Sequence, residues 1–206
     1  MIKFKHYKFD DIVSSSKKKT SSGRNAFFHM KEYDFLMTRK NPNVLEFGVA
    51  LGYSTCVFIN AVEKTGGFLY SCDIIDCGDR VIGSGKWKFI KCDDRNVNVI
   101  MQSGRIKKFD LIHIDSFIDY QKSNSHVIEL LEKWSKYLVK GGIITVRGVD
   151  NTPYKKGGRK ENYRKALMYE RVHEGIETFL EDNKGLFKAE FLYGSVGMAY
   201  LIKLKD

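Results

Sequence analysis

The sequence predicts an α/β fold: a three-layer sandwich around a seven-stranded, mostly parallel sheet that ends in an antiparallel hairpin. Two observations support this class. Short apolar, β-rich runs alternate with runs of helical period along the chain. The last two β-rich runs are joined by a Gly-Ser-Val-Gly turn, which is typical of a hairpin. At 206 residues, of which 43% are hydrophobic, the chain is long enough to bury the core of one such domain.

The first predicted strand covers residues 43–48 and leads into a helix over residues 54–64. That helix is indicated by Val57, Phe58 and Val62, which recur at helical spacing. Apolar runs then predict further strands at residues 67–74, 87–92 and 109–115.

A long amphipathic helix is predicted over residues 120–138, where Val127, Leu131 and Trp134 share one stripe. Gly141 is expected to follow the end of this helix, because glycine is common just past a helix C-terminus. The remaining predicted elements are a strand at 142–146, a helix at 161–180, and the hairpin strands at 187–194 and 198–204. Residues 1–40 have no assigned element. We expect one domain over 1–206, with 1–40 bordering the acceptor side of a cofactor-binding core at 41–206.

The net charge of +10 is concentrated in two segments. Residues 1–40 carry a net charge of +6 and residues 151–173 carry +5, which leaves the rest of the chain near neutral. Such basic segments favour an anionic partner, and the alternative for each is a solvated, flexible loop. No apolar run approaches the roughly 20 residues needed to cross a bilayer, and the N-terminus lacks an apolar leader. We therefore expect a cytoplasmic protein without a membrane span.

The four cysteines do not have the spacing of a metal site. Cys56, Cys72, Cys77 and Cys92 form no Cys-x-x-Cys pair, and no histidine lies at zinc-finger distance from them. We expect reduced, buried thiols. The alternative is a catalytic or redox thiol, for which Cys77 has the least buried sequence context.

The most informative stretch is LEFGVALGYST at residues 45–55. Gly48 and Gly52, with the small Ala50 between them, allow a backbone to pass close to a ligand, and the helix that opens near Ser54 presents free N–H groups. The dinucleotide fingerprint G-x-G-x-x-G is not matched, since it would need glycines at 48, 50 and 53. Glu46 at the start of this turn favours a ligand that carries positive charge.

Acidic residues follow two of the other predicted strands. Asp73 ends the second strand, where a carboxylate can accept hydrogen bonds from both hydroxyls of a ribose. Asp93 and Asp94 follow the third strand and can approach an adenine amino group. The alternative for a carboxylate in such a place is a turn or helix cap.

The order Glu46-x-Gly48-x-x-x-Gly52-x-Ser54-Thr55, then Asp73, Asp93 or Asp94, and His-Ile-Asp at 113–115, resembles the class I S-adenosylmethionine-dependent methyltransferases, which have a Rossmann-like fold. More narrowly, from residue 43 onward the chain resembles the macrocin-type and cephalosporin-biosynthesis O-methyltransferases. The resemblance implies S-adenosylmethionine as cofactor. The residues implied in binding it are Glu46, Gly48, Ala50, Gly52, Ser54, Thr55, Asp73, Asp93, Asp94 and Asp115.

The chain departs from this group where the chemistry is expected. Ile118 stands where the group has a histidine, so the catalytic candidates are Asp115, His113 and Asp119. For His113 the alternative is a packed structural histidine. Metal-dependent members have acids directly after the fifth strand, where this chain has Arg147-Gly148. A cation such as Mg²⁺ could be held by Asp115, Asp150 and Asn151. Alternatively, the site is metal-free and an anionic acceptor is bound by Arg147, Lys155, Lys156 and Arg159.

The predicted function is therefore methyl transfer from S-adenosylmethionine to a hydroxyl of a small acceptor that is anionic or contains a sugar. The basic segments keep a nucleic-acid methyltransferase open as an alternative, although no N/D-P-P-Y/F motif is present. The missing histidine and the shifted acids leave a third possibility, a catalytically degenerate binding protein with this fold.

Overall fold

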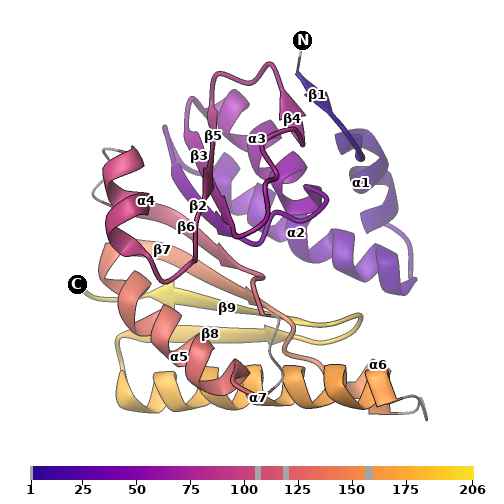
Figure 1. Ribbon diagram of the computed structural model, residues 1–206, viewed down its shortest axis with the longest axis vertical. Coiled ribbons are helices and arrows are strands. Elements are labelled where there is room, and N and C mark those ends of the chain that lie inside the picture. Colours follow the sequence, from indigo (N-terminus) through magenta and orange to yellow (C-terminus); the bar gives the residue numbers. More distant parts are fainter. Residues whose placement is uncertain (1, 105–107, 118–120, 156–159) are drawn as a thin grey trace.

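The computed structural model describes residues 2–104, 108–117, 121–155 and 160–206 (Figure 1). One seven-stranded sheet has the strand order β5-β3-β2-β6-β7-β9-β8. Its strands are β2 (Asn43–Phe47), β3 (Phe68–Asp73), β5 (Trp87–Lys91), β6 (Phe109–Ile114), β7 (Leu138–Arg147), β8 (Phe187–Leu192) and β9 (Met198–Lys203). All neighbours are parallel except β7–β9 and β9–β8, so the predicted fold class and its terminal hairpin are confirmed.

Helices cover both faces of the sheet and make the three layers (Figure 1). One face packs against α1 (Phe9–Ser16), α2 (Ser21–Met37) and α3 (Tyr53–Thr65), and the other against α4 (Val97–Gly104), α5 (Ser123–Trp134) and α7 (Lys160–Asp182). The shorter elements are β1 (Lys3–Phe4), β4 (Val81–Ile82), the 3₁₀ turn η1 (Ser135–Tyr137) and α6 (Thr152–Lys155). Strands β1 and β4 form a small antiparallel pair of their own.

Strand alternation divides the core between the two faces. In β2, Val44 belongs to the cluster under α2 and α3, whereas Leu45 and Phe47 belong to the cluster under α5 and α7. Trp134 anchors the second cluster: its ring lies 5.0 Å from that of Phe47, and its Nε1 donates to the Asp94 carbonyl at 2.9 Å. This bond ties α5 to the loop that follows β5.

The helix predicted over residues 120–138 ends earlier in the structure than the sequence pattern predicts. Helix α5 stops at Trp134, η1 follows, and β7 already begins at Leu138. Leu138 pairs with Phe109 of β6, and the next pair is Leu111 with Ile143, so β7 contains an irregularity. Gly141 has φ +73° inside it and does not follow a helix. The apolar Leu138 fits a helical stripe and a strand equally well, so periodicity alone could not separate them.

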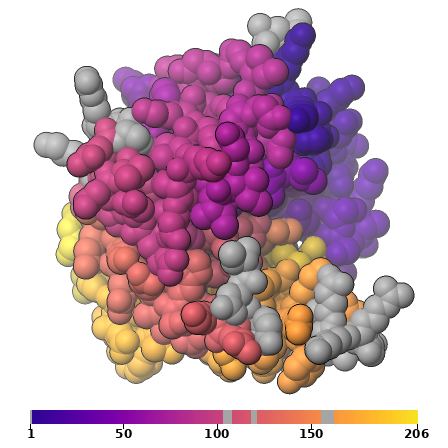
Figure 2. Space-filling view, viewed as in Figure 1, coloured from indigo at the N-terminus to yellow at the C-terminus, as the bar shows by residue number. Residues whose placement is uncertain are grey.

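Residues 1–40, for which no element was predicted, form β1, α1 and α2. The Thr20 hydroxyl caps α2 by accepting from the Gly23 N–H at 3.0 Å, and the Tyr200 hydroxyl donates to the Phe28 carbonyl at 2.6 Å. In Figure 2 this indigo segment lies directly against the purple part of the surface. No helix in the described part of the chain is long and apolar enough to cross a membrane.

The sheet topology creates a crevice. Strands β2 and β6 are neighbours, but the strands that follow each of them in the chain extend in opposite directions across the sheet. At such a switch point the loops after the two strands separate, and ligands bind in the space between them. The glycine turn follows β2 there, and Asp115 follows β6.

Candidate active site

The glycine turn passes within contact distance of the loop after β6. Gly48 has φ +87°, and a Cβ added there would lie 2.1 Å from the Asp115 carbonyl oxygen. On one side the Gly48 N–H donates to the Cys72 carbonyl at 3.0 Å, and on the other the Asp115 N–H donates to the Phe47 carbonyl at 2.9 Å. Only glycine fits this conformation and this close approach without strain.

A cavity of about 450 Å³ opens at the strand ends beside this turn. It is lined by six of the predicted cofactor residues, namely Gly48, Ala50, Asp73, Asp93, Asp94 and Asp115. Its other lining residues include Cys72, Ile74, Ile75, Cys92, Ser116, Phe117 and His126. The predicted residues Glu46, Gly52, Ser54 and Thr55 do not line it and lie behind the turn or at the start of α3. A cavity of this size with a few convergent polar groups suits a small-molecule ligand.

Asp73 holds the glycine turn while facing the cavity. Its Oδ2 accepts from the N–H groups of Val49 and Ala50 at 2.8 and 3.1 Å, and its Oδ1 accepts from the Ile75 N–H at 3.0 Å. These N–H groups use three of the roughly four acceptor sites of the carboxylate, so one site on Oδ1 remains for a ligand hydroxyl.

The two acids after β5 differ in their surroundings. Asp93 is half-buried and makes a two-pronged ion pair with Arg95 at 2.8 and 2.7 Å, which lowers the pKa of this carboxyl. Asp94 is buried and accepts from the Ser116 hydroxyl and from His126 Nε2, the latter at 3.1 Å. Asp94 therefore joins the loop after β5 to the loop after β6 and to α5.

Glu46 is fully buried beneath the glycine turn. Its carboxylate accepts from the hydroxyls of Ser54, Thr55 and Ser71, with the Ser54 and Ser71 distances at 2.5 and 2.6 Å. Burial raises the pKa of this carboxyl although the three hydroxyls oppose the shift. The contacts lock the start of α3 to β2 and β3, so Glu46 fixes the turn from behind.

An ion pair stands at the end of β6 and β7. Arg147 Nη1 donates to Asp115 Oδ2 at 2.7 Å, and Arg147 Nε donates to Asn25 Oδ1 of α2 at 3.2 Å. The side chains of Arg147 and Asp115 remain 26% and 34% exposed, so a ligand can reach both. Arg147 also acts electrostatically on Tyr53 and Tyr169. Burial raises the pKa of Tyr53 to about 12 and raises that of Tyr169, so both phenols are protonated at neutral pH.

The candidate metal ligands do not fit a divalent cation. Asp115 faces the Arg147 guanidinium, and Asp150 points elsewhere. Asp150 Oδ1 accepts from the N–H and hydroxyl of Thr152 at 2.9 and 2.6 Å, and Oδ2 accepts from the Gly194 N–H at 2.6 Å. Asp150 therefore caps α6 and fixes the β8–β9 turn. The positive charge of Arg147, held 2.7 Å from Asp115 Oδ2, repels a cation at that carboxylate, so no catalytic step is assigned to a metal.

Titration with Mn²⁺ tests whether Asp115 belongs to a divalent-cation site. We expect electron paramagnetic resonance to show no saturable Mn²⁺ site that depends on Asp115, because Arg147 already neutralises that carboxylate. Wild type and Asp115→Asn should give the same free Mn²⁺ signal at each addition. A stoichiometric site present in the wild type and absent from Asp115→Asn would contradict the assignment.

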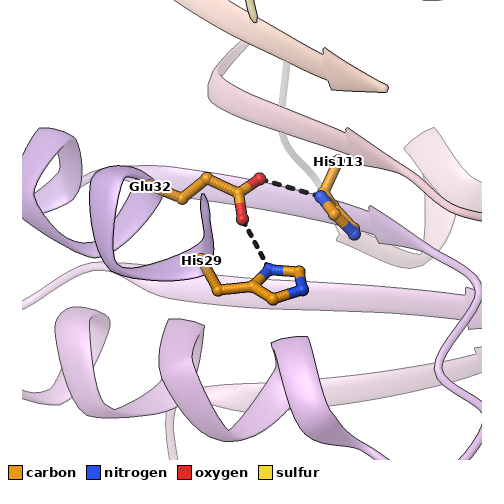
Figure 3. Close-up of side chains that lie close together, drawn as sticks. All are labelled: His29, Glu32 and His113. Carbon is orange, nitrogen blue, oxygen red and sulfur yellow. Dashed lines mark hydrogen bonds and ion pairs between the residues drawn. The ribbon is translucent and has the colours of Figure 1, made fainter. Parts of the chain in front are cut away.

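The candidate base His113 lies in a closed network with Glu32 and His29 (Figure 3). Glu32 of α2 bridges two histidines: its Oε1 lies 2.8 Å from His113 Nδ1 and its Oε2 lies 2.8 Å from His29 Nδ1. The Thr145 hydroxyl donates to Glu32 Oε1 at 2.5 Å. His113 is completely buried and does not line the cavity. The structure thus places His113 in a packed position under the sheet, which agrees with the alternative of a structural histidine.

The pH dependence of stability should reveal this network. Burial would raise the pKa of Glu32, but His113 and His29 lower it from 4.5 to about 2. The resulting stabilisation is complete above pH 4.5 and is lost as the pH falls toward 2. At pH 6, Glu32→Gln should lower the free energy of unfolding by about 3–5 kcal/mol, as expected for breaking a buried pair.

Urea unfolding at several pH values measures this effect. The difference between wild type and Glu32→Gln should shrink as the pH falls from 4.5 toward 2. The matched control is Asp34→Asn, which removes an exposed carboxylate from the same helix and should have little effect. A difference that stays constant over this range would show that Glu32 is not held ionised by the histidines.

Some predicted residues cannot be placed, and others were missed. Asp119, Lys156 and Arg159 lie outside the described residues, as does the side chain of Lys155. His126 and Asn25 were not assigned to the site, because neither follows a strand and no spacing rule connects them to it. Ser116 and Phe117 directly follow Asp115, and that position was the available signal for them.

Comparisons with known proteins identify the family and the fold. A family described as a methyltransferase domain matches residues 45–147, half of the chain. No curated protein sequence matches. Similar solved structures include a putative caffeoyl-CoA O-methyltransferase from Staphylococcus aureus, at 17% identity and TM-score 0.57, over 94% of this chain and 98% of that one. The N-methyltransferase NodS from Bradyrhizobium japonicum is 14% identical at TM-score 0.59, over 88% and 97% of the two chains.

A third similar structure contains ligands. MycE from the mycinamycin biosynthetic pathway, solved with Mg, SAH and mycinamycin VI, is 17% identical at TM-score 0.57, over 87% of this chain and 49% of that one. At these identities the three likenesses establish the fold. The matched family domain runs from β2 to the end of β7 and contains the glycine turn, Asp73 and Asp115. The chain belongs to the methyltransferase family and is an S-adenosylmethionine-dependent methyltransferase.

Proposed function

We propose that S-adenosylmethionine occupies the 450 Å³ cavity and that its methyl group is transferred to a hydroxyl of a small acceptor that is anionic or contains a sugar. The methionine part lies along the glycine turn at Gly48 and Ala50. A ribose hydroxyl donates to Asp73 Oδ1, and the adenine lies toward Asp93 and Asp94. The ordered carboxylates around the cavity complement the ammonium and sulfonium charges of the cofactor.

The observation that supports an anionic acceptor is the accessible Arg147 at the Asp115 end of the cavity. A guanidinium has five N–H donors, and the contacts with Asp115 and Asn25 use two of them. The others suit a phosphate or carboxylate, which arginine binds with paired hydrogen bonds. Because Asn25 belongs to α2, its contact with Arg147 supports a contribution of the N-terminal segment to the acceptor side.

Methyl transfer depends on placing the acceptor oxygen in line with the sulfonium, so positioning supplies much of the rate. The protonated phenols of Tyr53 and Tyr169, near Arg147, can donate hydrogen bonds to the acceptor. Asp115 is the carboxylate nearest this end of the cavity. Its ion pair with Arg147 holds the carboxylate in a fixed position, which supports a role in orienting the acceptor.

A methylation assay with labelled S-adenosylmethionine tests the proposal. Matched neutral and phosphorylated sugars serve as acceptors, including a nucleotide-linked sugar. We expect the phosphorylated acceptors to react with a kcat/KM about 10–100-fold higher, as one charge-assisted contact provides. High salt and Arg147→Ala should both reduce that preference. The charge-matched control Lys184→Ala lies on an exposed turn and should preserve it.

Other outcomes would overturn the proposal. Equal rates for neutral and phosphorylated acceptors, insensitive to salt, would contradict the anionic acceptor. Methylation of RNA or DNA with a steep salt dependence, and not of small acceptors, would favour a nucleic-acid substrate. Binding of the cofactor without turnover on any acceptor would favour a degenerate, non-catalytic protein.

A further inference from the structure

Two cysteine thiols lie together on the wall of the cofactor cavity. Cys72 belongs to β3 and Cys92 directly follows β5, and their Sγ atoms are 3.0 Å apart. The Cys72 thiol also donates to the Cys92 carbonyl at 3.0 Å. Cys72 is buried and Cys92 is half-buried, which reverses the expectation that Cys77 is the most open thiol, since Cys77 is 1% exposed. Both Cys72 and Cys92 line the cavity, so a reagent that enters it meets a thiol pair.

We propose that Cys72 and Cys92 form an oxidative modification site, at which a small peroxide converts the thiol pair into a disulfide and thereby weakens cofactor binding. The inference rests on the proposed placement of the cofactor in this cavity. It requires nothing of the acceptor.

One molecule of hydrogen peroxide oxidises one pair of thiols to a disulfide. The half-buried Cys92 sulfur attacks a peroxide oxygen, the O–O bond breaks, and a sulfenic acid and one water form. The Cys72 sulfur then attacks the Cys92 sulfur, the S–O bond breaks, and the hydroxyl leaves as a second water. The two thiols lose two protons and two electrons in total, and the peroxide is reduced to two waters.

The burial of Cys72 and Cys92 should make their oxidation slow. Burial raises the pKa of both thiols, so little of the reactive thiolate is present at neutral pH. A bound cofactor would also cover Cys92 and exclude the peroxide. Oxidation should therefore proceed mainly in the cofactor-free protein.

The positions of the two thiols explain why the bond would affect the cofactor. In the sheet register Cys72 lies opposite Ile90, two residues before Cys92. The two sulfurs must move closer to bond, which draws the chain after β5 toward β3. Asp73 follows Cys72, and Asp93 follows Cys92. Both flanking acids belong to the cavity lining, so the cavity should narrow where the adenosine is placed.

The test uses the full chain, first reduced and then treated with hydrogen peroxide, with and without S-adenosylhomocysteine (SAH), the demethylated cofactor. Intact and peptide mass spectrometry should show the loss of two hydrogens and a link between the peptides that contain Cys72 and Cys92. Calorimetry should show an SAH affinity at least about 10-fold weaker, restored by dithiothreitol. Saturating SAH should slow the oxidation.

Two serine variants distinguish oxidation of the Cys72–Cys92 pair from oxidation of the other cysteines. Cys92→Ser, at the half-buried position, should abolish both the link and the peroxide effect on SAH binding. Cys77→Ser should preserve both, because Cys77 contacts the Ala50 carbonyl and does not line the cavity. Failure of the link to form in folded, SAH-binding wild type would overturn the proposal, and so would a linked protein that binds SAH unchanged. Failure of the reduced protein to bind SAH would instead contradict the cofactor placement.

Discussion

Replacing Asp73 with alanine is expected to weaken SAH binding by about 10–100-fold. A ribose hydroxyl that donates to the remaining acceptor site of this carboxylate contributes about 1.5–3 kcal/mol, and 1.4 kcal/mol corresponds to a tenfold change in affinity. The same carboxylate accepts from the N–H groups of Val49 and Ala50, so its loss also loosens the glycine turn. Isothermal titration of wild type and variant with SAH measures the effect.

Two further variants sharpen this experiment. Asp73→Asn keeps the side-chain shape but loses the charge and one acceptor atom, so its affinity should lie between those of wild type and Asp73→Ala. Asp76→Ala removes an exposed carboxylate from the same loop that caps only a local turn through the Gly78 N–H. Asp76→Ala should bind SAH as the wild type does. An Asp73→Ala affinity within about threefold of wild type would rule out the ribose role.

The substitution Gly48→Ala is expected to abolish measurable SAH binding and to destabilise the fold. The new Cβ would lie 2.1 Å from the Asp115 carbonyl oxygen, a backbone atom that cannot turn away. The left-handed backbone adds about 1–2 kcal/mol for any residue with a Cβ. At this chain length a loss of 2 kcal/mol lowers the melting temperature by about 4–8 °C. Relief of the clash would separate β2 from β6 and displace Asp115.

Thermal unfolding and SAH titration of the same preparation measure both effects. The matched control is Gly85→Ala, where an added Cβ meets no atom within 4 Å and the backbone is not left-handed. It should leave both the melting temperature and the affinity unchanged. A Gly48→Ala protein that melts and binds SAH as the wild type does would show that the close approach of the two loops is not required.

The cofactor side of the site was predictable because its residues follow from position along single strands. Gly48, Asp73 and Asp94 each come at or directly after a β-rich run, and parallel strands bring such positions to one edge of the sheet. The two glycines of the turn carried the clearest sequence signal, and in the structure Gly48 and Gly52 both adopt positive φ. The alternation of strands and helices along the chain predicts both the fold and the edge of the sheet at which a ligand binds.

The rest depends on contacts between segments far apart in the sequence. Arg147 pairs with Asp115 and Asn25, which come from β7, the end of β6 and α2, and no local pattern reveals that meeting. Helix α2 was not predicted because polar His29 and Glu32 occupy its buried face, which hides the apolar stripe of a core helix. Glu46 was expected beside the ligand, but three hydroxyls hold it behind the turn.

Calorimetric titration of the reduced wild-type chain with SAH tests the central claim most directly, because it needs no knowledge of the acceptor. A cavity built by the glycine turn, Asp73 and Asp94 at the ends of β2, β3 and β5 should bind SAH saturably, with one site per chain. Absence of saturable binding at SAH concentrations up to about 1 mM would contradict the assignment of this cavity to the cofactor.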